Sequence, residues 1–175
     1  MEAIAFYSRV ASKAQAAFII FYSLESSPSC LMIDRTDNTL GFIGGMVESG
    51  ESLEEAAIRE ASEEIGHMVT AHLEPLVAHN IGTITTHAFT AEVGATELET
   101  IHAQAETGIH YGVELNSATI SSLSKSELIA LLPRPMAPSV REELIHFLFK
   151  ANIYKPSTLV QICEKAGYDL QELLR

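Results

Sequence analysis

Acidic residues are concentrated in one part of this 175-residue sequence, where they could bind cations. Fourteen carboxylates lie between Arg35 and Lys125, and seven of them fall within residues 48–64. Arg59 is the only lysine or arginine in the same stretch. Because so much negative charge repels a phosphate chain unless cations intervene, the cluster is either a solvated acidic face or a site for divalent metal.

The segment over residues 52–66 has the signals of a helix with defined ends. Ser52 and Glu55 have the S-x-x-E spacing of a capping box, and Gly66 suits the left-handed position after a last turn. At about 100° per residue, one arc of this helix is apolar and is predicted to pack on a sheet, with Ala57, Ala61, Ile65 and Ile58. The neighbouring arc carries three carboxylates, Glu60, Glu63 and Glu64.

Three glutamates on one edge of a helix are unfavourable without a cation. Two like unit charges ~4 Å apart repel by on the order of 4 kcal/mol at an effective dielectric constant of roughly 20. Mg²⁺ prefers oxygen ligands, keeps several waters and is usually bound by a few carboxylates together with substrate phosphate. The sequence therefore predicts a Mg²⁺ site, with Gly44–Gly45 allowing close backbone approach and Arg59 pairing with Glu51 or Glu60.

The spacing of these residues resembles the Nudix box, G-x5-E-x7-R-E-U-x-E-E-x-G-U, in which U is a bulky aliphatic residue. Every invariant position is filled, by Gly45, Glu51, Arg59, Glu60, Glu63, Glu64 and Gly66. Two aliphatic positions differ, because Ala61 is small and His67 stands at the last one, where Met68 is expected to take over the packing. Neither difference changes a carboxylate.

The resemblance implies a fold, a reaction and a set of ligands. Nudix proteins are α/β/α sandwiches with a mixed sheet, so residues 1–175 are expected to form a single domain. Helices over residues 139–175 are expected to pack on it or on a partner subunit. The family cleaves nucleoside diphosphates linked to another moiety, by attack of water on phosphorus. By this resemblance Mg²⁺, with Mn²⁺ as a substitute, is bound by Glu60, Glu63 and Glu64 and by the carbonyl of Gly44 or Gly45.

Outside the box, the chain is similar to the inosine diphosphatases and small nucleolar RNA decapping enzymes. The similar segments are residues 40–45, 84–89, 112–115 and 139–144. In that subgroup a glutamate at the position of Glu114 reaches the metals, which implies that Glu114 is a further ligand or the general base. The alternative is a solvated carboxylate on a strand. The first substrate expected is a purine nucleoside di- or triphosphate of the inosine type.

The residues expected to bind the substrate differ in part from that subgroup. Its first core strand carries a base-stacking histidine, where this chain offers only Gln15, and Ile43 replaces a usual proline. Phe42 is expected either to stack on a base or to belong to the core. His79 and His87 are expected to face each other across a hairpin near the site, in a substrate role or a structural one.

The elements that must position these residues follow from apolar, β-branched and turn-forming runs. Strands are predicted at residues 16–22, 30–34, 40–43 and 111–121, with a hairpin at residues 69–80 and 83–93. Helices are predicted at residues 97–106 and 139–150, and a final one begins at Pro156 and ends at Gly167. A rigid loop is indicated by Pro133, Pro135 and Pro138.

Composition limits the class of protein. Hydrophobic residues make up 47% of the chain, enough for a folded core, and no apolar run approaches the roughly 18 residues of a membrane helix. Cys30 and Cys163 have no metal-ligand spacing and are expected to be free thiols. An intracellular protein, cytoplasmic or nuclear, is expected, either as a monomer or as a homodimer.

Three further functions stay open at this point. RNA decapping is disfavoured by the net charge of −12, because only the part after residue 124, with seven basic and six acidic residues, offers a basic surface. ADP-ribose hydrolysis differs only in the leaving group. A catalytically inactive Nudix scaffold that binds partners is a different class, but such scaffolds normally lose box residues that this chain retains.

Overall fold

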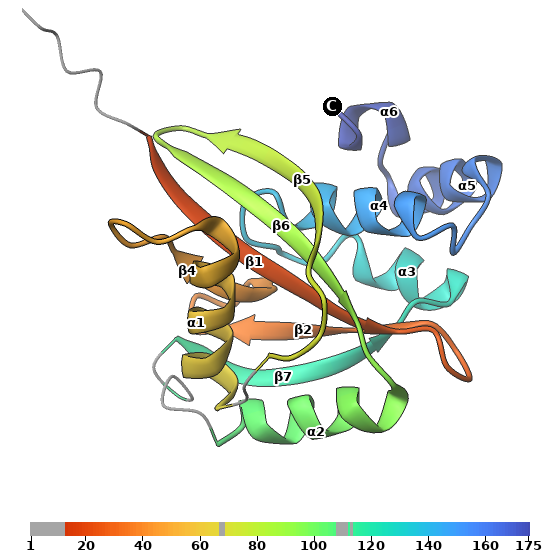
Figure 1. The fold of residues 1–175 in the computed structure, drawn as a ribbon. Coiled ribbons are helices and arrows are strands. Elements are labelled where there is room, and N and C mark those ends of the chain that lie inside the picture. The colour runs from red at the N-terminus through yellow and green to blue at the C-terminus, as the bar shows by residue number, and fades with distance from the viewer. Residues whose placement is uncertain (1–12, 67–68, 108–111, 113) are drawn as a thin grey trace, which may run out of the picture.

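A mixed sheet of seven strands forms the centre of the molecule (Figure 1). The computed structural model describes residues 13–66, 69–107, 112 and 114–175. The strands are β1 (Ala14–Ser23), β2 (Ser29–Arg35), β3 (Leu40–Gly41), β4 (Ile43–Met46), β5 (Glu74–Ile81), β6 (Ile84–Glu92) and β7 (Leu115–Ser122). Their order is β3-β2-β1-β6-β5, with β4 also beside β1 and β7 also beside β2. Among these described strands, β1 and β6 alone pair in parallel, and the other strand pairs are antiparallel.

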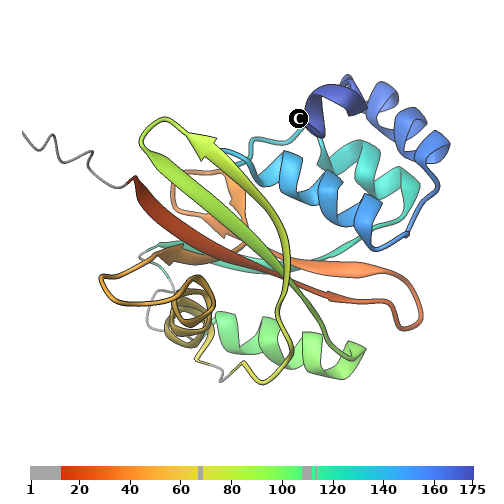
Figure 2. The ribbon, with the colours of Figure 1, turned by 45° about the horizontal axis from the view of Figure 1, so that its top comes forward.

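Helices cover both faces of this sheet (Figure 1, Figure 2). On one face lie α1 (Leu53–Ile65) and α2 (Ala95–Ala105). On the other lie α3 (Lys125–Leu131), α4 (Val140–Lys150), α5 (Pro156–Ala166) and α6 (Leu170–Leu173). The α/β fold with a mixed sheet between helices is thus confirmed. Among the described helices, none is both long and apolar enough to cross a bilayer.

The alternation of side chains along β1 divides the interior into two cores. Ala17, Ile19 and Phe21 are buried with α1 and α2, whereas Ile20 is buried with the four later helices. The second core also contains both cysteines, which are free thiols, and apolar side chains of α5 and α6. Odd-numbered and even-numbered residues of β1 therefore point to different faces of the sheet, so only one of the two sets can reach a site on a given face.

Most predicted elements are present, and the ends of the helix that carries the glutamate cluster were predicted most accurately. Ser52 caps α1 with both reciprocal hydrogen bonds of the capping box, and Gly66 ends it in the left-handed region at φ 62°. The hairpin of β5 and β6 is confirmed, but β5 begins at Glu74, five residues later than predicted. Pro156 and Gly167 bound α5 as predicted.

Two elements differ from the prediction. The short strand predicted at residues 40–43 is two strands, interrupted at Phe42, because β3 pairs with β2 whereas β4 pairs with β1. No helix was predicted at α3, because its seven residues are too few to display a helical period. The predictions for His67, Met68 and Tyr111 fall outside the described residues.

Candidate functional site

The site lies where one edge of β1 changes its pairing partner. Its first half pairs with β4, from Ala16 opposite Met46 to Ile19 opposite Ile43. Its last residues pair instead with β2, at Tyr22 and Ser23. Between these strands and α1 lies a cavity of about 480 Å³, the acidic pocket, whose lining includes Glu48, Glu60, Glu63, Glu64, Glu114, Arg35, Arg59, Gly44 and Gly45. The fold therefore brings together the box carboxylates, the two glycines and Glu114.

Glu64 is the most buried carboxylate of the acidic pocket. Glu64 is only 3% exposed, and its Oε2 accepts a hydrogen bond of 2.9 Å from the backbone N–H of Gly44. Burial raises the pKa of Glu64 to about 8; the Gly44 N–H opposes this rise, and the nearby charges of Glu60 and Glu114 add to it. A carboxyl so placed favours a neutralising partner, which a proton or a cation can supply.

Arg59 organises the remaining carboxylates. Nε lies 2.8 Å from Oε1 of Glu51, and Nη1 lies 2.9 Å from Glu60 and 3.3 Å from Glu63. Nη2 also donates to the carbonyl oxygen of Met46 at 2.9 Å. The hydrogen bonds that Arg59 donates to Glu51, and then to Glu60, raise the pKa of Arg59, so it stays charged. The predicted pairing with Glu51 or Glu60 is present with both, and the arginine links α1 to β4.

The two glycines of β4 leave no room for a side chain. A Cβ on Gly44 would lie 2.1 Å from the carbonyl oxygen of Ala17, on the neighbouring strand. A Cβ on Gly45 would lie 2.5 Å from the carboxyl carbon of Glu60. At Gly44 the obstacle is backbone, so only glycine fits there, whereas at Gly45 the end of the Glu60 side chain would have to shift. The two glycines let β4 lie close to both β1 and α1, with its backbone facing the carboxylates across the acidic pocket.

The donor set of this pocket fits a hydrated Mg²⁺. In the part of the chain that the structure describes, no three carboxylate, imidazole or thiolate groups are already arranged around one point as metal ligands, and Arg59 holds Glu60 and Glu63 in ion pairs. Mg²⁺ needs no such closed cage, because it keeps waters and takes further ligands from substrate phosphates. Five glutamates beside a glycine backbone provide oxygen ligands only, which suits a hard cation.

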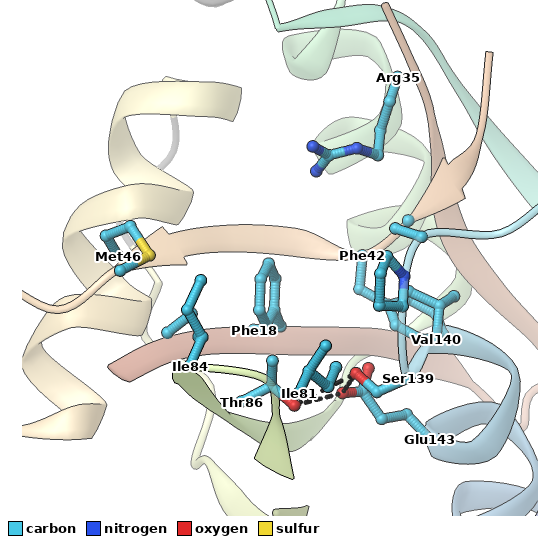
Figure 3. A pocket seen from close by; sticks show the side chains of 14 residues that line it. Phe18, Arg35, Phe42, Met46, Ile81, Ile84, Thr86, Ser139, Val140 and Glu143 are labelled. Atoms are coloured by element: carbon cyan, nitrogen blue, oxygen red, sulfur yellow. Dashed lines mark hydrogen bonds between the residues drawn. The ribbon is translucent and has the colours of Figure 1, made fainter. Parts of the chain in front are cut away.

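A second cavity adjoins the acidic pocket. This apolar pocket, of about 230 Å³, shares Ala16, Phe18, Arg35 and Met46 with the first. Phe42, Ile81, Ile84 and Val140 complete its apolar wall, and Thr86, Ser139 and Glu143 provide its polar groups (Figure 3). Phe42 is buried in the core, as expected, and also lines this cavity; stacking of its ring on a base stays a prediction. A ligand with a charged part and an apolar, planar part could occupy the two cavities together.

Arg35 lies at the junction of the two cavities, and sequence analysis did not identify it. Its side chain is 39% exposed and lies 3.6 Å from the carboxylate of Asp37, a weak surface pair. In Figure 3 its guanidinium stands across the apolar pocket from Glu143. One signal in the sequence was available. Arg35 and Arg59 are the only lysine or arginine residues in the acidic stretch of residues 35–124, and Arg59 pairs with Glu51 and Glu60.

Two residues expected to bind substrate lie elsewhere. Gln15 and His87 pair with each other, 2.9 Å apart, and line neither the acidic nor the apolar pocket. Both have odd residue numbers, which places their side chains on the face of the sheet opposite to that of Phe18 and Thr86. His87 lines a separate cavity beside the start of α1. The geometry therefore does not bring them to the site. Their alternation with the pocket residues is the physical reason.

The expectation that His79 and His87 face each other is wrong. The register of the hairpin places His79 opposite Thr86 and His87 opposite Ala78, so the two rings point to different faces. His79 instead contacts His146 of α4, with ring centroids 5.7 Å apart. Burial lowers the pKa of both rings, which favours neutral imidazoles packed between α4 and the hairpin.

A known protein family and several solved structures match this chain. A family model described as NUDIX domain matches residues 13–122. Among solved structures, a MutT/Nudix family protein from Enterococcus faecalis matches with a TM-score of 0.60 and 14% identity, over 98% of this chain and 79% of the other. A C. elegans Ap4A hydrolase matches with a TM-score of 0.57 and 16% identity, over 81% and 99%. A mutT/nudix family protein from Listeria innocua matches with a TM-score of 0.56 and 18% identity, over 80% of this chain and 96% of the other. A search of curated proteins found no match.

Proposed function

Because the chain belongs to the Nudix family, whose members are generally pyrophosphohydrolases of nucleotide derivatives, we propose that it hydrolyses a phosphoanhydride bond of a purine nucleoside di- or triphosphate. The observation that carries this proposal is the junction of two cavities. One is lined by five carboxylates, which suit a metal ion that in turn binds phosphate, and the other is apolar and lined by Phe18 and Phe42. Arg35 borders both.

Each group has a defined task in this proposal. Glu60, Glu63, Glu64 and Glu114, with a backbone carbonyl of Gly44 or Gly45, hold Mg²⁺. When bound, the metal neutralises phosphate oxygens and lowers the pKa of a coordinated water. Arg59 keeps Glu60 and Glu51 oriented. Arg35 binds a phosphate oxygen, and the rings of Phe18 and Phe42 pack against the base.

The alternative functions are less well supported by the same residues. An inactive scaffold would have no need of a buried carboxylate, and Glu64 is 3% exposed beside four further glutamates. RNA decapping would require lysines and arginines along the bound strand, whereas the two arginines that line the acidic pocket are accompanied by five glutamates. ADP-ribose remains an alternative of the same chemistry, and the leaving group distinguishes it.

A substrate panel tests the proposal. The panel contains IDP, ITP, GTP, ATP, ADP-ribose, a diadenosine polyphosphate and a capped RNA, each with Mg²⁺, and ³¹P NMR identifies the products. We expect turnover of purine nucleoside di- or triphosphates to exceed that of the other classes. Faster cleavage of ADP-ribose or capped RNA would replace the substrate assignment while retaining the hydrolase. No turnover of any member would favour the scaffold.

Arg35→Gln is expected to lower kcat/KM by about ten- to a hundredfold. The reason is the loss of a charge-assisted hydrogen bond to phosphate, of which a typical one contributes about 1.5–3 kcal/mol. Steady-state kinetics with the preferred nucleotide measures the change. Arg134→Gln is the matched control, because Arg134 also pairs with an aspartate, at 3.3 Å, but lines neither cavity. Equal effects of the two variants would remove Arg35 from the site.

Glu114→Gln is expected to lower kcat about tenfold or more with little change in melting temperature. Glu114 lines the acidic pocket, and its charge contributes to the raised pKa of Glu64, so it is close enough to act as a ligand or as the general base. Glu99→Gln, on the exposed side of α2, is the control. Kinetics indistinguishable from wild type would return Glu114 to the solvated strand carboxylate considered at first.

A further inference from the structure

Glu143 is a buried carboxyl that the proposed chemistry does not use. It is 1% exposed, comes from α4 and lines the apolar pocket on the side away from the glutamate cluster. Its Oε1 accepts a hydrogen bond of 2.7 Å from the hydroxyl of Ser139 and one of 3.4 Å from that of Thr86 (Figure 3). Among the described residues, Oε2 has no hydrogen-bond partner.

Stability does not account for this carboxyl. Burying an ionisable group costs free energy unless its oxygens are paired, and here only one of the two is. Burial accordingly raises the pKa of Glu143 to about 7, although the hydroxyls of Ser139 and Thr86 oppose the rise. A leucine or glutamine would fill the same space among Phe42, Val140 and Ile81 at lower cost. An unpaired oxygen in a cavity that adjoins a phosphate site is suited to a ligand.

The two hydroxyls determine what Glu143 can bind. Both hydroxyls are within hydrogen-bond distance of Oε1 and also lie 3.2 Å from each other, so their hydrogens are used within this group, where they fix the carboxyl, and none is presented to the cavity. Ionised, Oε2 is then an acceptor at the polar end of an otherwise apolar pocket. A ligand that fits must be flat and apolar on its faces and must carry an N–H on its edge. The 6-oxopurines, hypoxanthine and guanine, carry such a hydrogen on ring N1. Adenine carries its edge hydrogens on the 6-amino group instead and has an acceptor at N1, which an ionised carboxylate facing the N1 position repels.

We propose that Glu143, held by Ser139 and Thr86, selects 6-oxopurine bases by accepting the N1–H of the base through Oε2. The proposal rests on the proposed function only in assigning the adjoining acidic pocket to the phosphates. It adds a specificity-determining residue and names the chemical group that is recognised. Thr86 and Ser139 are positioning residues, because they act through Glu143.

Nucleoside binding tests the proposal without metal or phosphate. Inosine, 1-methylinosine and adenosine are titrated into the wild-type protein at about pH 8, where Glu143 is ionised, and binding is followed by NMR or calorimetry. Inosine is expected to bind about tenfold or more tightly than either of the others, the factor typical of one hydrogen bond to a charged group. Equal affinities, or no binding of inosine at millimolar concentration, overturn the proposal.

Glu143→Gln separates hydrogen bonding from shape. The amide has the same size and retains an oxygen for the two hydroxyls, but it presents an NH₂ donor to the base in place of an acceptor. The preference for inosine over 1-methylinosine is expected to fall to about twofold or less. A preference unchanged in this variant means that the methyl group is excluded by shape alone, which overturns the role of Glu143. Thr86→Val provides a second variant that keeps the carboxyl but loosens it, and an intermediate preference is expected.

These outcomes are distinguishable from failure of the proposed function. A protein that hydrolyses nothing but binds inosine with the expected preference retains the base site and loses the hydrolase. A protein that hydrolyses ITP and 1-methyl-ITP equally well retains the hydrolase and loses the base site. Circular dichroism of each variant confirms that the fold is retained.

Discussion

Glu64→Gln is expected to abolish metal-dependent turnover while the fold is kept. The amide has the shape of the carboxylate and can still accept the N–H of Gly44, 2.9 Å away, so the link between α1 and β4 survives. It cannot supply the negative charge that a divalent cation requires, and loss of one such preorganised group typically lowers kcat by about 10²–10³-fold or more. Without metal, the melting temperature should not fall, because a carboxyl with a raised pKa is replaced by a neutral group.

The matched control for this variant lies on the same helix. Glu54 is exposed in the first turn of α1 and does not line the acidic pocket. Glu54→Gln should leave kcat within about twofold of wild type, as a surface change far from the site does. If Glu64→Gln also kept wild-type turnover, Glu64 would not be a metal ligand, and the interpretation of the buried carboxyl would be wrong.

Gly44→Ala is expected to have the largest effect on stability. The new Cβ would lie 2.1 Å from the carbonyl oxygen of Ala17 and 2.6 Å from the Cα of Phe18, and both are backbone atoms of a central strand. The residue also has φ of 149°, which L-residues rarely adopt. Overpacking and backbone strain together cost about 4 kcal/mol or more. Thermal unfolding should show a melting temperature lowered by roughly 10 °C or more, or no soluble protein.

Gly50→Ala is the control for the backbone strain alone. Gly50 has φ of 86°, but a Cβ there meets no atom within 4 Å. Its substitution should cost about 1 kcal/mol, from conformation without a clash. If Gly44→Ala destabilised the protein no more than Gly50→Ala does, β4 would not pack against β1 as closely as described, and the acidic pocket would lose one wall.

Sequence reasoning was accurate where the information is local. The ends of α1 follow from side chains that bond to the backbone three residues away, as at Ser52 and Glu55. The shared edge of Glu60, Glu63 and Glu64 follows from the helical repeat, and the pairing of Arg59 with Glu60 from their adjacent places on the same helix. Such features depend on one element and need no knowledge of its neighbours.

The parts that sequence reasoning missed depend on how distant elements meet. Glu143 reaches the apolar pocket because α4 packs beside Thr86, fifty-seven residues earlier in the chain. Arg35, the last residue of β2, lines both cavities because the sheet places this end of β2 between them, a position that its isolation in the sequence did not reveal. Gln15 and His87 were misplaced by the parity of strand positions, since a shift of one residue along β1 or β6 moves a side chain to the other face.

The rate of nucleotide hydrolysis by the wild-type protein as a function of free Mg²⁺ tests the central claim most directly. The concentration is varied from EDTA-chelated buffer to the millimolar range, with ITP or GTP as substrate. The expected result is no turnover in EDTA, a rise to saturation with Mg²⁺, and recovery with Mn²⁺ after chelation. Hydrolysis that proceeds equally fast in EDTA would contradict the account, because the glutamates of the acidic pocket would then have no cation to hold.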